Sequence, residues 1–210
     1  MKSKSSMLSN EHIAMAFGTP VSTFLWPDSV AINTSLRKTI LAKKKIDNGQ
    51  SRSNVGGWHS DPDMLNWRGD GIGPLKQRIT TFASDIIRLT SGQTTQPTDA
   101  VKLDCWANVS QRGHYNSVHY HPHSIWSGVY YVDGGMPDNS DPCNGRLELL
   151  DPRLGIAMLS SKHTMYLGRF LIEPTPGLML VFPSWLSHMV HPFSGDGERI
   201  SISFNIKFES

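Results

Sequence analysis

Histidine is concentrated in two short segments of the chain. His119, His121 and His123 occupy alternate positions in HYHPHSIWSGVYYV (residues 119–132), and His188 and His191 follow the apolar run LMLVF. Side chains at i and i+2 of a strand share one face, so two imidazoles there can bind one ion. Nitrogen ligands without thiolates suit Fe, Zn, Cu or Ni. The histidines indicate a metal site, although a polar strand edge would carry the same residues.

The C-terminal segment, in which polar and apolar residues alternate, adds a possible anion-binding site. In RISISFNIKF (residues 199–208) every second residue is polar and every other one is apolar, which predicts a strand with two different faces. The polar face either meets water or lines a ligand cavity. Arg199 and Ser201 share it, and a guanidinium with a neighbouring hydroxyl can bind one carboxylate.

Two helices are expected before the strands. Residues 28–45 repeat Ile32, Leu36 and Ile40 every four positions and end in three lysines. Residues 74–90 begin with Pro74 and carry an apolar stripe formed by Leu75, Ile79, Phe82, Ile86 and Leu89. Residues 46–56 are predicted to be a loop. The apolar stripes need a flat surface to cover.

From residue 101 onward the sequence favours strands. Short β-branched and aromatic runs are separated by Gly, Pro, Asn and Asp: VKLDCWANVS, SIWSGVYYV, GRLELL, HTMYLGRFLIE, GLMLVF and RISISFNIKF. Such runs predict an antiparallel sandwich or small barrel. We expect a mainly β protein with N-terminal helices, as one domain over 1–210 that comprises supporting helices and loops at 28–90 and a β core at 101–210.

Composition excludes several classes of protein. The 20 basic and 18 acidic residues leave a net charge of +2, too small to indicate general binding to nucleic acid or to anionic membranes. Cys105 and Cys143 are far apart and form no C-x-x-C pair, so neither a disulfide framework nor a thiolate zinc site is expected. The first residues lack the apolar core of a signal peptide, and no run is long enough for a membrane span. We expect a cytoplasmic protein.

The order of these residues resembles that of the 2-oxoglutarate and Fe(II)-dependent (2OG-Fe(II)) oxygenases. That family has an H-x-D/E pair, a distant histidine and an R-x-S carboxylate anchor, and this chain has the same order. The resemblance is nearest to an uncharacterised bacterial and phage subgroup, whose pattern is H-x-H-P, W-S-G-V-Y-Y-V, D-P-R, F-P-S-W-L-x-H and R-I-S-I-S-F-N. It extends to SNVGGWHS at residues 53–60, and so covers most of the chain.

The resemblance implies a fold and a set of site residues. The fold would be a double-stranded β-helix, a cupin-like jelly roll whose outer face the helices cover. The metal ligands would be His119, His121 and His188, where His188 is preferred to His191 because it precedes Arg199 by the spacing of the prolyl hydroxylase relatives. Arg199, Ser201 and Tyr131 would hold the cosubstrate, and Asn108 and Asn205 are further candidates for the cavity wall. No catalytic residue is expected beyond the metal site.

The implied activity is that of a dioxygenase. With Fe(II) bound, O2 and 2-oxoglutarate would be consumed to hydroxylate a small-molecule or peptidyl substrate, with release of succinate and CO2. His121 departs from the family because it stands where an Asp or Glu is expected, and the substrate is not identified by the sequence. Two alternatives stay open: a cupin-like three-histidine metalloenzyme that does not use 2-oxoglutarate, and a non-catalytic ligand-binding barrel. A homodimer is the default expectation for a chain of this size.

Overall fold

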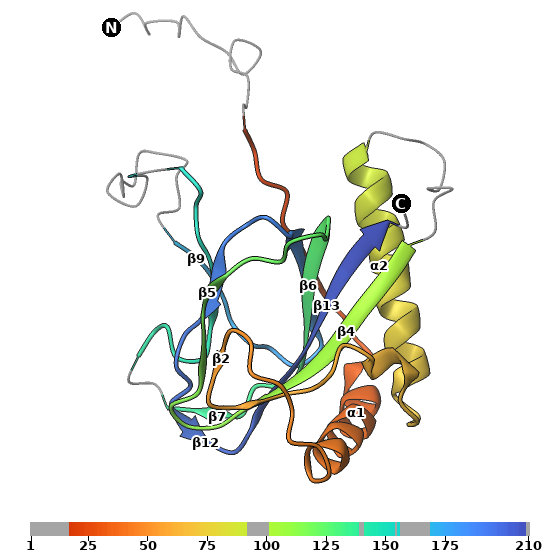
Figure 1. The fold of residues 1–210 in the computed structure, drawn as a ribbon, viewed down its shortest axis with the longest axis vertical. Coiled ribbons are helices and arrows are strands. Elements are labelled where there is room, and N and C mark those ends of the chain that lie inside the picture. The colour runs from red at the N-terminus through yellow and green to blue at the C-terminus, as the bar shows by residue number, and fades with distance from the viewer. Residues whose placement is uncertain (1–16, 92–100, 139–140, 154, 156–168, 209–210) are drawn as a thin grey trace, which may run out of the picture.

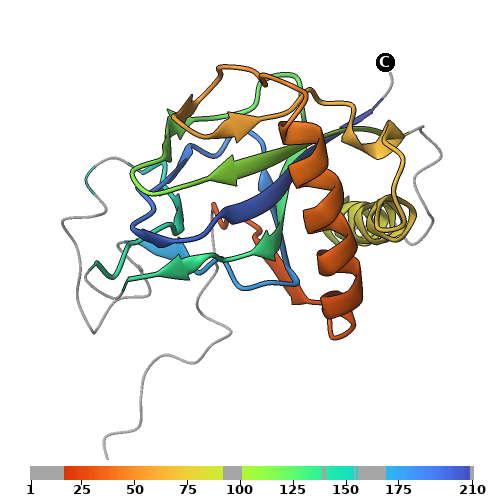
Figure 2. The ribbon, with the colours of Figure 1, turned by 90° about the horizontal axis from the view of Figure 1, so that it is seen from below.

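The computed structural model describes residues 17–91, 101–138, 141–153, 155 and 169–208. Two antiparallel β-sheets face one another, and two helices lie on the outside of the larger sheet (Figures 1 and 2). Figure 2 shows α1 lengthwise and α2 end-on beside strands β4 and β13. The prediction of a mainly β protein with N-terminal helices is confirmed. None of the helices in the described segments is long and apolar enough to cross a membrane.

The two predicted helices are present with small shifts at their ends. Helix α1 spans Ser29–Lys44 and helix α2 spans Ile72–Ser91, so α2 begins two residues before Pro74. The buried stripe of α2 differs from the predicted one. Leu89 is exposed, and Ala83 and Ile87 are buried instead. Leu89 follows Ile87 by two residues, about 200° around the helix, and therefore faces away from the sheet.

The larger sheet contains most of the predicted strands. Its order is β1 (Ser22–Leu25), β10 (Leu178–Pro183), β6 (Trp126–Asp133), β13 (Arg199–Phe208), β4 (Val101–Ser110) and β3 (Trp58–His59). Strand β13 lies between β4 and β6 and pairs with both in antiparallel register. Both neighbours therefore satisfy the backbone of β13, which holds its side chains in a fixed alternation.

The smaller sheet is built from shorter strands. Its order is β2 (Asn54–Val55), β5 (Tyr115–His119), β11 (His188–Val190), β8 (Leu147–Leu149) and β9 (Phe170–Ile172). A separate two-stranded ribbon joins β7 (Met136–Pro137) to β12 (Gly195–Asp196), and a 3-10 turn, η2, spans Met64–Asn66. The expected loop at 46–56 contains β2. Most of the predicted strand HTMYLGRFLIE lies outside the described residues, and β9 is its described end.

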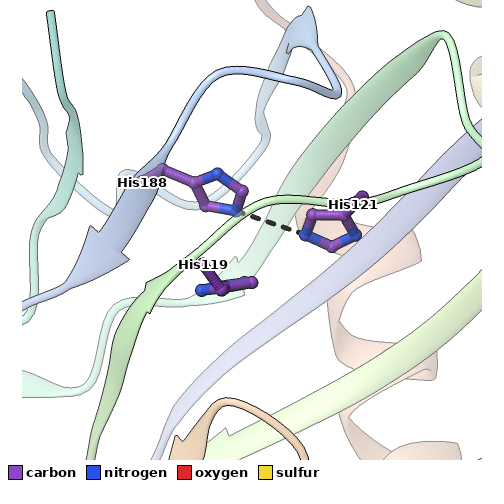
Figure 3. Close-up of side chains that lie close together, drawn as sticks. All are labelled: His119, His121 and His188. Carbon is purple, nitrogen blue, oxygen red and sulfur yellow. Dashed lines mark hydrogen bonds between the residues drawn. The ribbon is translucent and has the colours of Figure 1, made fainter. Parts of the chain in front are cut away.

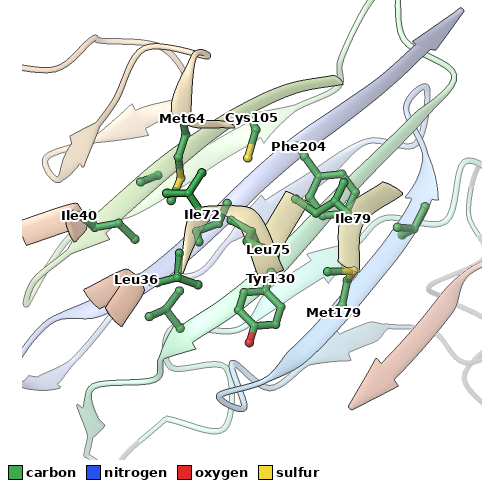
Figure 4. Packing of buried hydrophobic residues seen from close by; sticks show 14 of the residues in the cluster. Leu36, Ile40, Met64, Ile72, Leu75, Ile79, Cys105, Tyr130, Met179 and Phe204 are labelled. Carbon is green, nitrogen blue, oxygen red and sulfur yellow. The ribbon is translucent and has the colours of Figure 1, made fainter. Parts of the chain in front are cut away.

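Apolar residues form two clusters, one on each side of the larger sheet. The outer cluster packs α1 and α2 against β13, whose Ile200, Ile202, Phe204 and Ile206 are fully buried (Figure 4). The inner cluster lies between the two sheets and is smaller; it includes Val129, Leu180 and Phe182. The apolar face of β13 therefore meets the helices, and its polar face points between the sheets.

The outer cluster gives a prediction about stability. Gly128 of β6 lies against Phe204, and a Cβ added there would come 2.2 Å from Phe204 Cζ and 2.8 Å from the Leu180 carbonyl oxygen. Gly128→Ala is therefore expected to destabilise the protein by about 1–3 kcal/mol, measured as a lower urea midpoint. Gly73→Ala in α2 is the control, because a Cβ there meets no atom within 4 Å. An unchanged midpoint for Gly128→Ala would contradict the packing.

Candidate functional site

A cavity of about 520 Å³ lies between the inner faces of the two sheets. The larger sheet contributes the polar face of β13 together with inward-pointing residues of β4 and β6, and the smaller sheet contributes β5, β8 and β11. All eight site residues predicted from the sequence line this one cavity: Asn108, His119, His121, Tyr131, His188, Arg199, Ser201 and Asn205.

Three histidines of the cavity lining lie close together (Figure 3). His119 ends β5 and His188 begins β11, and the two residues are paired directly across the strands. His121 lies in the turn after β5, not on the strand itself. One nitrogen from each ring lies within 4.8 Å of the other two, and the Nε2 atoms of His121 and His188 are 3.2 Å apart. The three predicted histidines therefore lie together, although strand β5 ends at His119 and does not include His121.

Backbone carbonyls orient two of the rings. Nδ1 of His119 is 2.8 Å from the Ser117 carbonyl oxygen, and Nδ1 of His188 is 2.9 Å from that of Leu186. A carbonyl oxygen only accepts, so each Nδ1 carries the proton and each Nε2 is the nitrogen with the lone pair. That of His119 lies 3.3 Å from Ser53 Oγ, and that of His188 lies 3.2 Å from His121 Nε2. Histidines that bind metals are held in this way, by a hydrogen bond from the ring nitrogen that does not bind.

Trp106 of β4 positions the third ring. It stacks on His121 with ring centroids 5.7 Å apart and an angle of 20° between planes. Trp106 also stacks on His59, at 5.5 Å and 17°. His121 also lies nearly parallel to His188, at 5.1 Å and 13°. The His121 ring, which lies after the end of β5, is therefore positioned by contacts with two flat side chains, Trp106 and His188.

All three histidines are neutral near pH 7. Burial lowers the pKa of His119, lowers that of His121 to about 4 and lowers that of His188 to about 3, and the nearby imidazoles add to the effect for the last two. Neutral imidazole is the form that binds a metal. Two nitrogens each about 2.1 Å from one ion, at an angle of about 100°, lie about 3.2 Å apart, which fits the observed separation. The His121–His188 separation therefore fits two ligands of one divalent ion, and His119 offers a third nitrogen within 4.8 Å of both.

These pKa shifts predict how the metal-free protein responds to acid. In the unfolded chain the histidines are protonated with a pKa near 6.5. In the folded site the pKa values of His121 and His188 are well below 6.5, so these rings are protonated only at lower pH. The folded state therefore loses stability as the pH falls from about 6.5 toward 4. We expect the urea midpoint of the metal-free chain to fall between about pH 7 and about pH 5. His188→Gln should show a weaker dependence, and an equal dependence in both proteins would contradict the assignment.

Arg199 lines the same cavity. Its side chain is 98% buried, its Nε donates to the Gly145 carbonyl oxygen at 2.9 Å, and its guanidinium carbon lies 5.3 Å from the centre of the Tyr131 ring. Within the described segments no carboxylate forms an ion pair with it. A buried cation of this kind is costly unless an anion joins it. Ser201 lies two residues along the same strand face and is also buried.

Tyr131 and the two asparagines complete this wall. The Tyr131 hydroxyl is buried and has no hydrogen bond of good geometry to any described residue, although the Arg199 guanidinium lies close enough to act on its pKa. Burial raises its pKa, so it stays a neutral donor. Asn108 donates to Ser203 Oγ at 3.0 Å, and Asn205 accepts from Ser127 Oγ at 2.8 Å. A buried cation and an unsatisfied buried hydroxyl point to an anionic ligand between them.

The other two histidines lie away from the cluster. His191 Nε2 is 2.6 Å from Glu148 Oε2, and Arg169 also binds that carboxylate through two nitrogens. His123 is exposed in the turn and has a backbone φ of 62°. The sequence-based choice of His188 over His191 agrees with this placement. His59, Trp106 and Arg52 also line the cavity and were not predicted.

Residues 104–205 match a family model described as "Putative 2OG-Fe(II) oxygenase". No curated protein matches the chain by sequence. The predicted resemblance is confirmed over the segment that carries the histidines and the R-x-S pair.

Several solved structures share the fold. A prolyl-4-hydroxylase from Pseudomonas putida is similar at 14% identity and a TM-score of 0.61, covering 90% of this chain and 93% of that one. A prolyl hydroxylase from Trichoplax adhaerens, in complex with a hypoxia inducible factor peptide fragment, has 16% identity and a TM-score of 0.59, with 89% and 83% covered. HygX from Streptomyces hygroscopicus, with nickel and 2-oxoglutarate bound, has 12% identity and a TM-score of 0.55, with 90% and 83% covered. The predicted double-stranded β-helix is confirmed.

Proposed function

We infer that this chain, whose residues 104–205 belong to the 2OG-Fe(II) oxygenases, is an Fe(II)- and 2-oxoglutarate-dependent dioxygenase. The observation that carries the inference is the set of side chains that line one cavity. Three neutral imidazoles lie close together, and a buried guanidinium without a carboxylate partner in the described structure lines the same cavity. Three imidazoles can bind a metal ion. A buried guanidinium can bind one carboxylate of a dicarboxylate.

Each residue has a defined part in the proposed reaction. His119, His121 and His188 hold the metal, and Arg199 holds the far carboxylate of 2-oxoglutarate, aided by Ser201 and by the Tyr131 hydroxyl. When bound, Fe(II) and 2-oxoglutarate would let O2 act as the oxidant, with one oxygen atom going to the substrate and the other to succinate as CO2 is released. The apolar side chains Phe182, Leu147 and Val190 limit water around the histidines. The protein contributes ligands, orientation and shielding from solvent.

The experiment that tests this function is an anaerobic titration. The full chain is loaded with Fe(II), 2-oxoglutarate is added in the absence of oxygen, and the visible spectrum is followed for a charge-transfer band. We expect a band that saturates with 2-oxoglutarate. If the purified protein contains zinc and no band forms, the proposed function is wrong.

A three-histidine metalloenzyme that does not use 2-oxoglutarate is the second candidate. One observation favours it: His121 lies where the family has a carboxylate, and no Asp or Glu of the described residues joins the cluster. The same titration separates the two candidates, because this enzyme would hold its metal without a response to 2-oxoglutarate.

The role of His121 can be tested by exchanging the ligand atom. His121→Glu is expected to retain bound metal, because a carboxylate oxygen is a normal ligand for Fe(II). His121→Leu, which has no ligand atom, should lose at least about tenfold in metal affinity. Elemental analysis after dialysis measures both variants. If His121→Leu holds metal as tightly as the unmodified chain, His121 is not a ligand.

We further propose that the substrate is a small molecule or a peptide, as is the hypoxia inducible factor fragment in the Trichoplax complex. One domain over residues 1–210, a cytoplasmic location and a homodimer stay predictions. Size-exclusion chromatography with light scattering tests the last of these.

A further inference from the structure

The charged residues that line the cavity indicate which chemical group of a substrate the cavity can bind. Among the described residues these are Arg52, Asp104 and Arg199. Asp104 forms an ion pair with Lys207, and Arg199 is assigned to 2-oxoglutarate in the proposed function. Arg52 is therefore the one cation of the described lining that neither a carboxylate nor the cosubstrate neutralises.

Arg52 is held in place by the loop that carries it. Its Nε donates to Gln50 Oε1 at 3.1 Å, and its backbone N–H donates to Asn54 Oδ1 at 2.8 Å. Gln50 in turn donates its backbone N–H to the His59 carbonyl oxygen at 2.8 Å, which ties the loop to β3. The two terminal nitrogens of the guanidinium make no hydrogen bond within the described structure. They are the pair that binds a carboxylate through two parallel hydrogen bonds.

His59 supplies an acceptor on the same wall. The residue is 92% buried, its backbone pairs with Asn108, and its ring stacks on Trp106. Nδ1 is 2.7 Å from the Ser60 carbonyl oxygen and so carries the proton. Burial lowers the pKa of the ring, and the charge of Arg52 lowers it further, so the ring is neutral. Nε2 then offers a lone pair, and it has no partner in the part of the chain that the structure describes.

We propose that Arg52 and His59 bind the prime substrate by its head group, and that the substrate is a small α-amino or α-hydroxy acid. The carboxylate pairs with Arg52, and the neighbouring ammonium or hydroxyl donates to His59 Nε2. The proposal rests on the proposed function, since it assigns Arg199 to the cosubstrate. A volume of about 520 Å³ lies at the smaller end of ligand pockets and must hold 2-oxoglutarate as well, which favours a small second ligand.

Calorimetric titration of the full chain, saturated with Fe(II) and 2-oxoglutarate under anaerobic conditions, tests this proposal. The probes are the common L-amino acids in one arm and the corresponding 2-hydroxy acids in the other, each beside its carboxamide. We expect at least one free acid to bind about tenfold or more tightly than its carboxamide. The arm in which it is found identifies the donor.

Three variants assign the binding to this wall. Arg52→Gln and His59→Phe should each weaken the acid about 10-fold to 100-fold, whereas the affinity for 2-oxoglutarate should change less than about twofold. Arg88→Gln, on the exposed face of α2, is the control and should change neither. Arg52 is exposed, so its variant is expected to fold normally.

Two results would overturn the proposal. One is that every acid binds no better than its carboxamide while 2-oxoglutarate binds normally. The other is that Arg52→Gln leaves the affinity for the acid unchanged. Failure of the unmodified chain to bind 2-oxoglutarate is a different result, which the same titration detects and which overturns the proposed function.

Discussion

Replacing His188 with alanine is expected to lower the metal affinity of the protein by about 100-fold or more. His188 is 96% buried at the start of β11, directly across from His119, and its Nδ1 is fixed by the Leu186 carbonyl oxygen. No other described histidine is placed to substitute for it, since His191 is bound to Glu148. Competition with a chelator of known affinity, followed by elemental analysis, measures the loss.

His123→Asn is the matched control for this prediction. His123 lies in the same turn as His121 but is exposed, and asparagine tolerates its positive φ. The control should bind metal as the unmodified chain does, and both variants should unfold in urea as single transitions. Equal metal affinity in His188→Ala and the unmodified chain would show that the cluster is not the metal site.

The long elements were predictable from periodicity, and the short ones were not. The helices α1 and α2 and the strands β4 and β13 each have enough residues for an apolar repeat to appear. Strands β2, β3 and β11 have two or three residues, too few to show any alternation. They form because neighbouring strands pair with them, which is a property of the tertiary structure.

The sequence of β13 alone could not show what its polar face contacts. Its alternation allowed either water or a ligand on the polar side. The helices decide between these, because their stripes cover the apolar face and leave the polar face to the smaller sheet. The presence of two apolar helix stripes was visible in the sequence, but the face that they cover was not.

Strand spacing indicated a metal site, but the choice of His119, His121 and His188 as its ligands came from the family pattern. A regular strand would have aligned all three histidines of residues 119–123, whereas the structure ends β5 at His119 and turns His121 inward. His59 and Trp106 were missed because neither belongs to a cluster of possible metal ligands in the sequence. The only available signal was the resemblance over SNVGGWHS, which marks His59 without giving it a role.

Arg199→Lys is expected to weaken 2-oxoglutarate binding about 10-fold to 100-fold and to leave metal binding unchanged. Lysine keeps the charge, but it cannot offer two parallel donors to a carboxylate. It also loses the hydrogen bond that Nε makes to Gly145 and the contact of the flat guanidinium with Tyr131. Titration of the Fe(II) protein, followed by its charge-transfer band, gives the affinity.

Arg37→Lys controls for a general effect of exchanging arginine. Arg37 of α1 pairs with Asp133 and Glu198, and it does not line the cavity. Its variant should bind metal and 2-oxoglutarate with unchanged affinity. If Arg199→Lys also binds 2-oxoglutarate normally, the buried guanidinium is not the anchor. Arg52 would then be the other cation of the described lining that could bind the dicarboxylate, and Arg52→Gln would weaken 2-oxoglutarate instead of the substrate acid.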